Sequence, residues 1–271
     1  MALARKLVFN KLKNILGLGE VRACVSGAAP LSKDIISFFA GLDLPIYEVY
    51  GQSEDCGPTT FNAPRATRLG TVGKPLAGLQ IKIEKDGEIC VKGPNVFKGY
   101  LKDEAATHGA LKDGWLHSGD IGHLDSEGYL TITDRKKDLL ITAGGKNISP
   151  QNLECLLKQI PFVNLAVVIG DQKKYLSALL TPDQEALSLF AQEHQLGVDS
   201  LSDFVQHPRI LDEIQCHIDK INQSLASVEQ IKRFILLAAD FSIENGELTP
   251  TLKIKRKAIN IRYQKQIDAL Y

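Results

Sequence analysis

The sequence lacks the features of a membrane-spanning or secreted protein. It has no run of about 18 apolar residues, which a transmembrane helix would need, and no secretory signal peptide. Its five cysteines are scattered along the chain, with no CxxC pair and no Cys/His cluster, so neither a zinc site nor a disulfide framework is predicted. These absences favour a protein of the reducing cytoplasm.

The chain also lacks net charge, because 32 basic residues balance 32 acidic ones. Proteins that bind nucleic acid usually carry a basic excess, so nucleic acid is not an expected partner. The balance is uneven near the C-terminus, where residues 253–271 contain one acid, Asp268, and a set of basic residues: Lys253, Lys255, Arg256, Lys257, Arg262 and Lys265. This run predicts either a solvated helix face or a cationic segment that meets phosphates.

What the chain does contain is a globular composition, with 44% hydrophobic and 24% charged residues. A length of 271 residues suits one large domain or two smaller ones. Residues 1–19 are basic and partly apolar, and they predict an amphipathic helix that packs on another part of the protein.

The pattern of residues 20–69 predicts part of a parallel sheet. Residues 21–28 read as a short apolar strand that runs into a turn of small residues, and Pro30 and Ser32 then begin a helix. A second buried strand follows at residues 46–50. Strand, helix and strand with short connections are typical of a parallel sheet covered by helices.

From about residue 70 to residue 134 the pattern changes to short β-prone pieces separated by turns. Residues 85–88 contain Asp-Gly, which supplies the positive φ of a tight hairpin turn, and residues 125–128 predict another turn. This pattern predicts a small antiparallel, barrel-like unit.

Residues 135–271 predict a separate α+β domain. Its first helix begins at Ser149 and Pro150, a cap followed by proline in the first turn. The later predicted elements are strands at 164–170 and 175–181, helices near 183–195, 199–205 and 208–225, a strand near 232–238 and a last helix from about 255. We therefore predict two domains, 1–134 and 135–271, and an α/β plus α+β fold class.

Two polar segments follow the predicted strands of the first domain. In Ser26–Leu31 (SGAAPL), small residues let the backbone approach a flat ligand closely, although a plain turn before a helix would have the same composition. Tyr50–Glu54 (YGQSE) follows a parallel strand at its carboxyl end, where open α/β sheets bind ligands. Its aromatic ring, hydroxyl and carboxylate suit a base, a phosphate and Mg²⁺, and the alternative is a polar loop.

Two further segments contain charged residues beside glycines. In Trp115–Asp120 (WLHSGD), the carboxylate offers two acceptor oxygens to a ribose, or the aspartate simply forms a turn. In Asp134–Asp138 (DRKKD), arginine suits bidentate recognition of phosphate. Ala143–Asn147 (AGGKN) follows, and the two segments together also fit a hinge-like loop with surface charge.

The order of these segments is more informative than any one of them. GAAPL, YGQSE, WLHSGD, DRKKDLLITAGGKNISP and LTPTLKIKR follow one another between about residue 20 and about residue 260. In this order they resemble the signature motifs of the AMP-forming adenylating superfamily, which includes acyl-CoA synthetases, luciferases and peptide-synthetase adenylation domains. The last two segments look most like those of long-chain fatty acyl-CoA synthetases.

The resemblance implies a nucleotide site. Asp120 would bind the ribose hydroxyls, and Arg135 would contact ribose or phosphate. Tyr50 would stack on or flank the adenine. The remaining adenine-pocket residues would be Gly27, Ala28, Ala29, Gly51 and Gln52.

The resemblance also implies catalytic residues. Glu54 would coordinate Mg²⁺, and Ser53, where the family usually has threonine, would offer its hydroxyl to phosphate. Lys253 aligns with the lysine that bridges the carboxylate and the α-phosphate during adenylation. Lys137 would be the hinge of the C-terminal domain. The acyl-CoA-forming site would lie near two glycines, Gly144 and Gly145.

The implied reaction is the ATP-dependent activation of a long-chain fatty acid. ATP supplies AMP to the carboxylate, pyrophosphate leaves, and the thiol of the substrate CoA then attacks the acyl-AMP. Mg²⁺ and a lysine would stabilise the negative charge at the α-phosphate. A small mobile C-terminal domain that rotates between the two steps would deliver Lys253 in one of them and withdraw it in the other.

One family motif is missing from these residues, the phosphate loop of the type TSGTTGxPKG, and Gly17–Glu20 does not replace it. The chain is therefore expected to be about the second half of a synthetase and to be inactive alone. Its N-terminal sheet is expected to be truncated and to expose apolar surface, which favours self-association.

Two other functions stay open at this point. One is a fatty acyl-AMP ligase that loads a carrier protein, and the other is a non-catalytic binding module that keeps the fold. The expected partners are small molecules, namely fatty acid, ATP and CoA, and peripheral contact with a membrane is left open.

Overall fold

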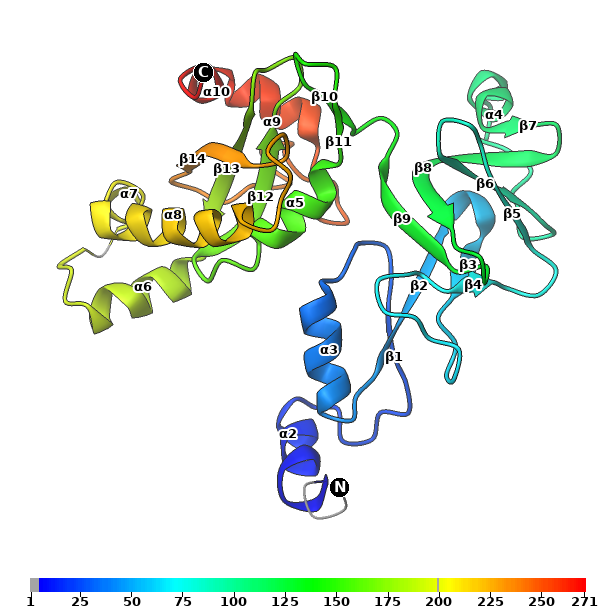
Figure 1. Ribbon diagram of the computed structural model, residues 1–271, viewed down its shortest axis with the longest axis horizontal. Coiled ribbons are helices and arrows are strands. Elements are labelled where there is room, and N and C mark those ends of the chain that lie inside the picture. The colour runs from blue at the N-terminus through cyan, green and yellow to red at the C-terminus, as the bar shows by residue number, and fades with distance from the viewer. Residues whose placement is uncertain (1–4, 199) are drawn as a thin grey trace. The chain divides into compact units, whose positions relative to one another are not determined.

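The computed structural model describes residues 5–198 and 200–271. The chain divides into two compact units, one ending at Lys137 and one beginning at Asp138. Each unit has its own sheets (Figure 1) and its own apolar core.

The first unit begins with a π-helical segment, η1 (Arg5–Phe9), and helix α2 (Asn10–Ile15). These segments take up part of the helix predicted for residues 1–19, and the first four residues of that prediction lie outside the described residues. Helix α2 has no buried residue, and Ile15 is 72% exposed. The apolar side chains of α2 therefore make few packing contacts with the rest of the unit.

A four-stranded sheet follows, in the order β1-β2-β3-β4. Strands β1 (Cys24–Ser26) and β2 (Ile46–Gln52) are parallel, as predicted. Helix α3 (Lys33–Gly41) connects them and begins where the Ser32 hydroxyl accepts a hydrogen bond from the Ile35 N–H at 3.3 Å. The remaining pairs, formed by β3 (Gly57–Phe61) and β4 (Lys74–Pro75), are antiparallel.

The second sheet of this unit is antiparallel throughout, in the order β5-β6-β8-β7 with β9 beside β8. Over the described residues it does not close on itself. Its apolar core of Ile89, Val91, Leu116 and Leu130 also includes Tyr50 of the first sheet. The elements are β5 (Gln80–Ile83), β6 (Glu88–Lys92), α4 (Glu104–Ala110), β7 (Leu111–Lys112), β8 (Trp115–Leu124) and β9 (Leu130–Arg135).

The second unit is built on a three-stranded sheet, β12-β13-β14. Its first pair is antiparallel and its second is parallel. A short hairpin of β10 (Leu140–Ile141) and β11 (Asn147–Ile148) precedes it. The remaining elements are α5 (Pro150–Leu157), β12 (Val163–Ile169), β13 (Leu176–Pro182), α6 (Gln184–Glu193), α7 (Leu201–Phe204), α8 (Pro208–Asn222), β14 (Ile231–Leu236), α9 (Arg256–Arg262) and α10 (Gln264–Asp268).

Helices cover both faces of this sheet (Figure 1). Side chains alternate between the two faces along a strand, so one strand contributes residues to two apolar clusters. On β12, Ala166 and Val168 belong to a cluster with residues of α5, α6 and α8. Val167 and Ile169 belong to a second cluster with residues of α9 and α10. Every residue of β13 is buried, including Ser177 and Thr181, which agrees with its largely apolar sequence.

The mixed α/β architecture with several sheets confirms the predicted fold class. Of the predicted helix at 199–205, the first residue lies outside the described residues, and α7 accounts for part of the rest. Among the described residues, no helix is both long and apolar enough to cross a bilayer.

Candidate functional site

Three of the predicted site residues meet in the first unit, where β2, β8 and β9 come together. The Tyr50 hydroxyl donates a hydrogen bond to Asp120 Oδ2 at 2.8 Å, and Arg135 Nε donates to Asp120 Oδ1 at 3.0 Å. Asp120 and Arg135 are register partners across β8 and β9. Strand pairing brings Arg135 to Asp120, 15 positions earlier, and contact between the two sheets brings Tyr50, which lies 70 positions before Asp120.

Tyr50 and Asp120 are buried, whereas the Arg135 side chain is 50% exposed. Burial, together with the neighbouring Asp120 carboxylate, raises the pKa of Tyr50 well above its ordinary value, so the phenol stays a hydrogen-bond donor. A carboxylate has about four lone-pair sites, and Tyr50 and Arg135 use two of them. Acceptor capacity for ribose hydroxyls therefore remains on Asp120.

The loop after β2 turns through a short 3-10 helix, η2 (Ser53–Asp55). Buried Asp55 fixes this loop, because its carboxylate accepts the Gln52 N–H and the Thr59 hydroxyl, both at 2.7 Å. Ser53 is exposed and Glu54 is half-buried. The two adjacent carboxylates thus differ in role, since Asp55 shapes the loop while Glu54 is presented at its surface.

Glu54 is also positioned by a residue that the sequence did not indicate. Its Oε1 accepts a hydrogen bond from the Tyr100 hydroxyl at 2.8 Å, and its carbonyl accepts the Phe97 N–H at 2.8 Å. This hydrogen bond to Glu54 and partial burial raise the pKa of Tyr100. No sequence spacing connects Tyr100 to Glu54, which lies 46 residues earlier. The Glu54 carboxylate, held in place by Tyr100, is a hard oxygen ligand of the kind that Mg²⁺ takes.

Two of the predicted glycines stand where no side chain fits. A Cβ on Gly51 would lie 1.7 Å from the Gly57 carbonyl oxygen, and one on Gly27 would lie 2.7 Å from Val49 Cγ1. Gly27 is followed by Ala28, in the left-handed region at φ +68°, and by Ala29. These small residues let the chain after β1 approach the end of β2 closely.

Gln52 carries a polar atom that the protein itself does not satisfy. Within residues 5–198 and 200–271, its amide Nε2 is buried and has no hydrogen-bond partner. An unpaired buried donor costs free energy unless a ligand or water accepts from it. The atom is enclosed by protein, so a buried water would satisfy it, and it does not by itself indicate a ligand.

Lys137 is the last residue of the first unit and is exposed. The preceding Lys136 is held, because its N–H donates to the Gly119 carbonyl at 2.8 Å and its Nζ pairs with Asp86 at 2.6 Å and Glu88 at 3.0 Å. The chain is therefore fixed up to Lys136, and the division between the units falls directly after Lys137.

The second unit contains the other predicted residues. Gly144 and Gly145 form the turn between β10 and β11. Lys253 is exposed in a loop before α9, where its N–H donates to the Thr249 hydroxyl at 3.0 Å. In the described part of the chain Lys253 forms no ion pair.

The C-terminal basic run divides into residues that are paired within the fold and residues that are exposed to solvent. Arg256 is part of the fold, since it pairs with buried Glu154 at 2.7 Å and donates to the Val168 carbonyl at 2.9 Å. Arg262 pairs with buried Glu247 at 3.1 Å. Lys253 and Lys257 stay exposed and are available to an anion.

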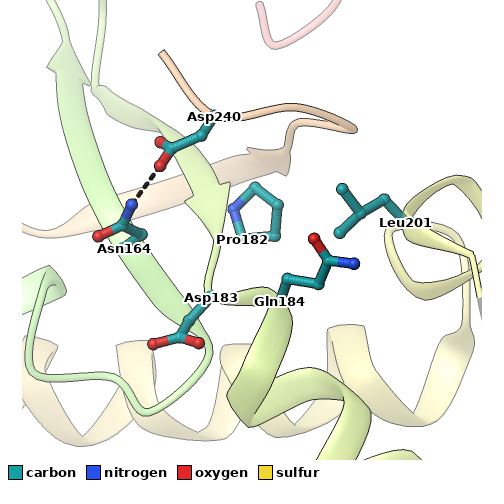
Figure 2. Close-up of a pocket in the computed structure, with 6 residues that line it drawn as sticks. All are labelled: Asn164, Pro182, Asp183, Gln184, Leu201 and Asp240. Carbon is teal, nitrogen blue, oxygen red and sulfur yellow. Dashed lines mark hydrogen bonds between the residues drawn. The ribbon is translucent and has the colours of Figure 1, made fainter. Parts of the chain in front are cut away.

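A surface hollow of about 300 Å³ in the second unit contains none of the predicted residues (Figure 2). Asn164 donates a hydrogen bond to Asp240 at its edge. The lining residues are Asn164, Pro182, Asp183, Gln184, Leu201 and Asp240. The hollow lacks the convergent groups of the Asp120 cluster, so it is not the candidate site.

Known proteins resemble this chain in sequence and in fold. Residues 2–101 match the AMP-binding enzyme family, and residues 137–271 match the AMP-binding enzyme C-terminal domain. The chain thus belongs to the AMP-binding enzyme family, which confirms the resemblance of its motifs.

Two curated relatives are named as ligases. The chain is 42% identical over 267 residues to the long-chain-fatty-acid–CoA ligase FadD15 of Mycobacterium bovis, covering 98% of this chain and 44% of that protein. It is 41% identical over 292 residues to the long-chain-fatty-acid–CoA ligase ACSBG2 of Xenopus laevis, covering 99% of this chain and 40% of that protein. The chain therefore spans less than half the length of these relatives.

A solved structure shares the fold. The O-succinylbenzoate coenzyme A synthetase MenE of Bacillus subtilis, in complex with ATP and magnesium ion, superposes with a TM-score of 0.65 at 28% identity. The match covers 91% of this chain and 49% of that one.

Proposed function

We propose that this chain contributes the ribose- and Mg²⁺-binding residues and the mobile domain of an ATP-dependent long-chain fatty acid–CoA ligase. The observation that carries the proposal is the Tyr50–Asp120–Arg135 cluster, which joins a buried carboxylate to an exposed guanidinium. The names of the relatives support fatty acid and CoA as substrates, and the ATP and magnesium ion in MenE support nucleotide and metal use.

In this proposal each side chain has one task. Asp120 accepts the ribose hydroxyls, Tyr50 flanks the adenine, and Gln52 lies beside the base. Gly27, Ala28, Ala29 and Gly51 line the adenine pocket. The two glycines allow close packing of the chain there, because a Cβ on Gly27 would meet Val49 and one on Gly51 would meet Gly57.

Three groups stabilise the negative charge at the reacting phosphate. Ser53 donates its hydroxyl to a phosphate oxygen, and Glu54 holds Mg²⁺. The metal, when bound, supplies electrostatic stabilisation of the developing negative charge. Lys253, which forms no ion pair among the described residues, bridges the fatty acid carboxylate and the α-phosphate during adenylation.

Thioester formation uses the second unit differently. Chain rotation at Lys137 withdraws Lys253 and brings Gly144 and Gly145 to the acyl-adenylate, where their small size admits the CoA thiol. The firm attachment of Lys136 to Asp86 and Glu88 supports a rotation that begins after that residue.

The proposal is tested by AMP binding to the purified chain, measured by equilibrium dialysis. Asp120→Ala should weaken binding by about tenfold or more, because hydrogen bonds to a charged group each contribute about 1.5–3 kcal/mol. Asp34→Ala, which removes an exposed aspartate from the first turn of α3, should leave binding unchanged. If the Asp120→Ala chain bound AMP as tightly as the unmodified chain, Asp120 would not bind the ribose.

A further inference from the structure

The second sheet of the first unit brings a cysteine, a histidine and a glutamate together. Cys90 on β6 and His117 on β8 are register partners, and Cys90 Sγ lies 3.5 Å from His117 Nδ1. Glu84, just after β5, completes the group, because one ligand atom of each residue lies within 4.8 Å of the others. None of these residues takes part in the proposed chemistry.

We propose that Cys90, His117 and Glu84 form a site for a divalent transition metal, with Zn²⁺ as the matching ion. A thiolate, an imidazole and a carboxylate are the ligand types that zinc takes in proteins. The site does not depend on the proposed ligase function.

The distances fit a tetrahedral ion. With Zn–S of about 2.3 Å and Zn–N of about 2.1 Å, sulfur and nitrogen of one tetrahedral site lie about 3.6 Å apart. The observed 3.5 Å between Cys90 and His117 matches this separation without movement of either side chain. Glu84 needs to approach by roughly 1 Å to reach ligand distance. Its side chain is 34% exposed at the hairpin, so it is free to do so.

The surrounding charges favour a cation. Glu88 Oε2 lies 3.2 Å from the same His117 Nδ1, so a metal at Nδ1 would replace this hydrogen bond, and the ring proton would sit on Nε2. Lys82 pairs with one oxygen of Glu84 at 2.6 Å, and Lys136 pairs with Glu88 at 3.0 Å. A carboxylate has two oxygens, so Glu84 retains one for the metal.

Cys90 is fully buried, and burial and then the Glu88 charge raise the pKa of its thiol to about 11. The free thiol is therefore neutral and a poor nucleophile. A bound metal deprotonates a coordinating thiol outright. A water molecule would complete the coordination of three protein ligands.

The consequence of the metal would be structural. It would tie the β5–β6 hairpin to β8, and β8 carries Asp120 three residues after His117. A ligand that binds only the folded state stabilises it by mass action, so Zn²⁺ should raise the unfolding temperature of the chain.

The test is calorimetric titration of the chelator-treated chain with Zn²⁺ in excess Mg²⁺, which saturates hard oxygen sites. One equivalent should bind, and Co²⁺ in its place should give a thiolate charge-transfer absorption band. Cys90→Ser should abolish the band. Glu84→Gln, on the partly exposed rim, should keep the fold and weaken Zn²⁺ binding by about tenfold or more.

Cys56→Ser and His123→Gln remove an exposed cysteine and an exposed histidine, and they should leave Zn²⁺ binding unchanged. The proposal is overturned if the unmodified chain gives no charge-transfer band, or if Zn²⁺ affinity survives Glu84→Gln unchanged. It is equally overturned if the band persists in Cys90→Ser or disappears in Cys56→Ser.

Discussion

The two units differ in how completely they bury their apolar residues. In the second unit, two apolar clusters cover both faces of the β12-β13-β14 sheet. In the first unit, the segment around β1 and α3 leaves Val25 56% exposed and Phe38 63% exposed. Side chains that read as core in the sequence are therefore at the surface there.

This difference shows that an apolar helix face can be left exposed in one unit and buried in the other. Helix α3 has an apolar face, but only Ile36 on it is buried. Helix α8 has one too, and Ile210, Ile214 and Ile218 are all buried against the sheet. An apolar stripe predicts a buried face only when a partner surface is present.

The largest expected effect tests the complete core of the second unit. Leu180 on β13 is fully buried, so Leu180→Ala should lower the free energy of unfolding by about 2–5 kcal/mol through lost burial and a cavity. Urea unfolding followed by circular dichroism measures this change. Leu189→Ala on α6, where the side chain is 55% exposed, should change it by less than about 0.5 kcal/mol. Similar losses for both variants would contradict the assigned core.

An intermediate effect is expected at the exposed apolar surface of the first unit. Phe38→Ser should weaken self-association of the chain, because it removes a large aromatic group from that surface. Sedimentation velocity over a range of protein concentrations measures the association. Leu189→Ser, at an isolated exposed position in the second unit, is the matched control and should leave it unchanged. A chain that is monomeric at every concentration would refute this prediction.

The smallest effect concerns the polar turn that joins β8 and β9. The backbone N–H of Tyr129, followed by that of Glu127 and by Arg68, lowers the pKa of Asp125 below its ordinary 3.8. A lowered folded-state pKa contributes stability above the unfolded-state value and loses it as pH falls through the folded-state value.

Asp125→Asn should therefore reduce stability slightly near neutral pH, and the difference from the unmodified chain should shrink below about pH 4. Urea midpoints measured across this range give the comparison, with Asp34→Asn as the exposed control. A difference that grows as the solution is acidified would reverse the sign and exclude the assigned hydrogen bonds.

Much of the fold followed from local sequence. The cap at Ser32, the turns at residues 85–88 and 125–128 and the largely apolar strands β12 and β13 depend on neighbouring residues, so pattern alone locates them. The roles assigned to Asp120, Glu54 and Lys253 stay predictions. The order of the motifs was enough to assign these roles to positions in the sequence. It did not predict that Asp120 contacts Tyr50.

Other parts of the site were not predictable in the same way. Glu54 and Asp55 are adjacent carboxylates that the local sequence does not distinguish. Asp55 is the buried one, because its carboxylate accepts hydrogen bonds from the Gln52 N–H and the Thr59 hydroxyl. The sequence showed no Cys/His cluster, because Cys90 and His117 lie 27 residues apart. Strand pairing of β6 with β8 places them opposite each other.

By itself, the sequence determined the family, the order of motifs and the type of most elements, since these depend on residue identity and short-range periodicity. The tertiary structure alone decided which apolar faces are covered, which of two carboxylates is buried, and which distant residues meet at Asp120 and at Cys90. The physical reason is that burial and side-chain contact arise from strand register and packing between segments far apart in the chain, and no local pattern encodes them.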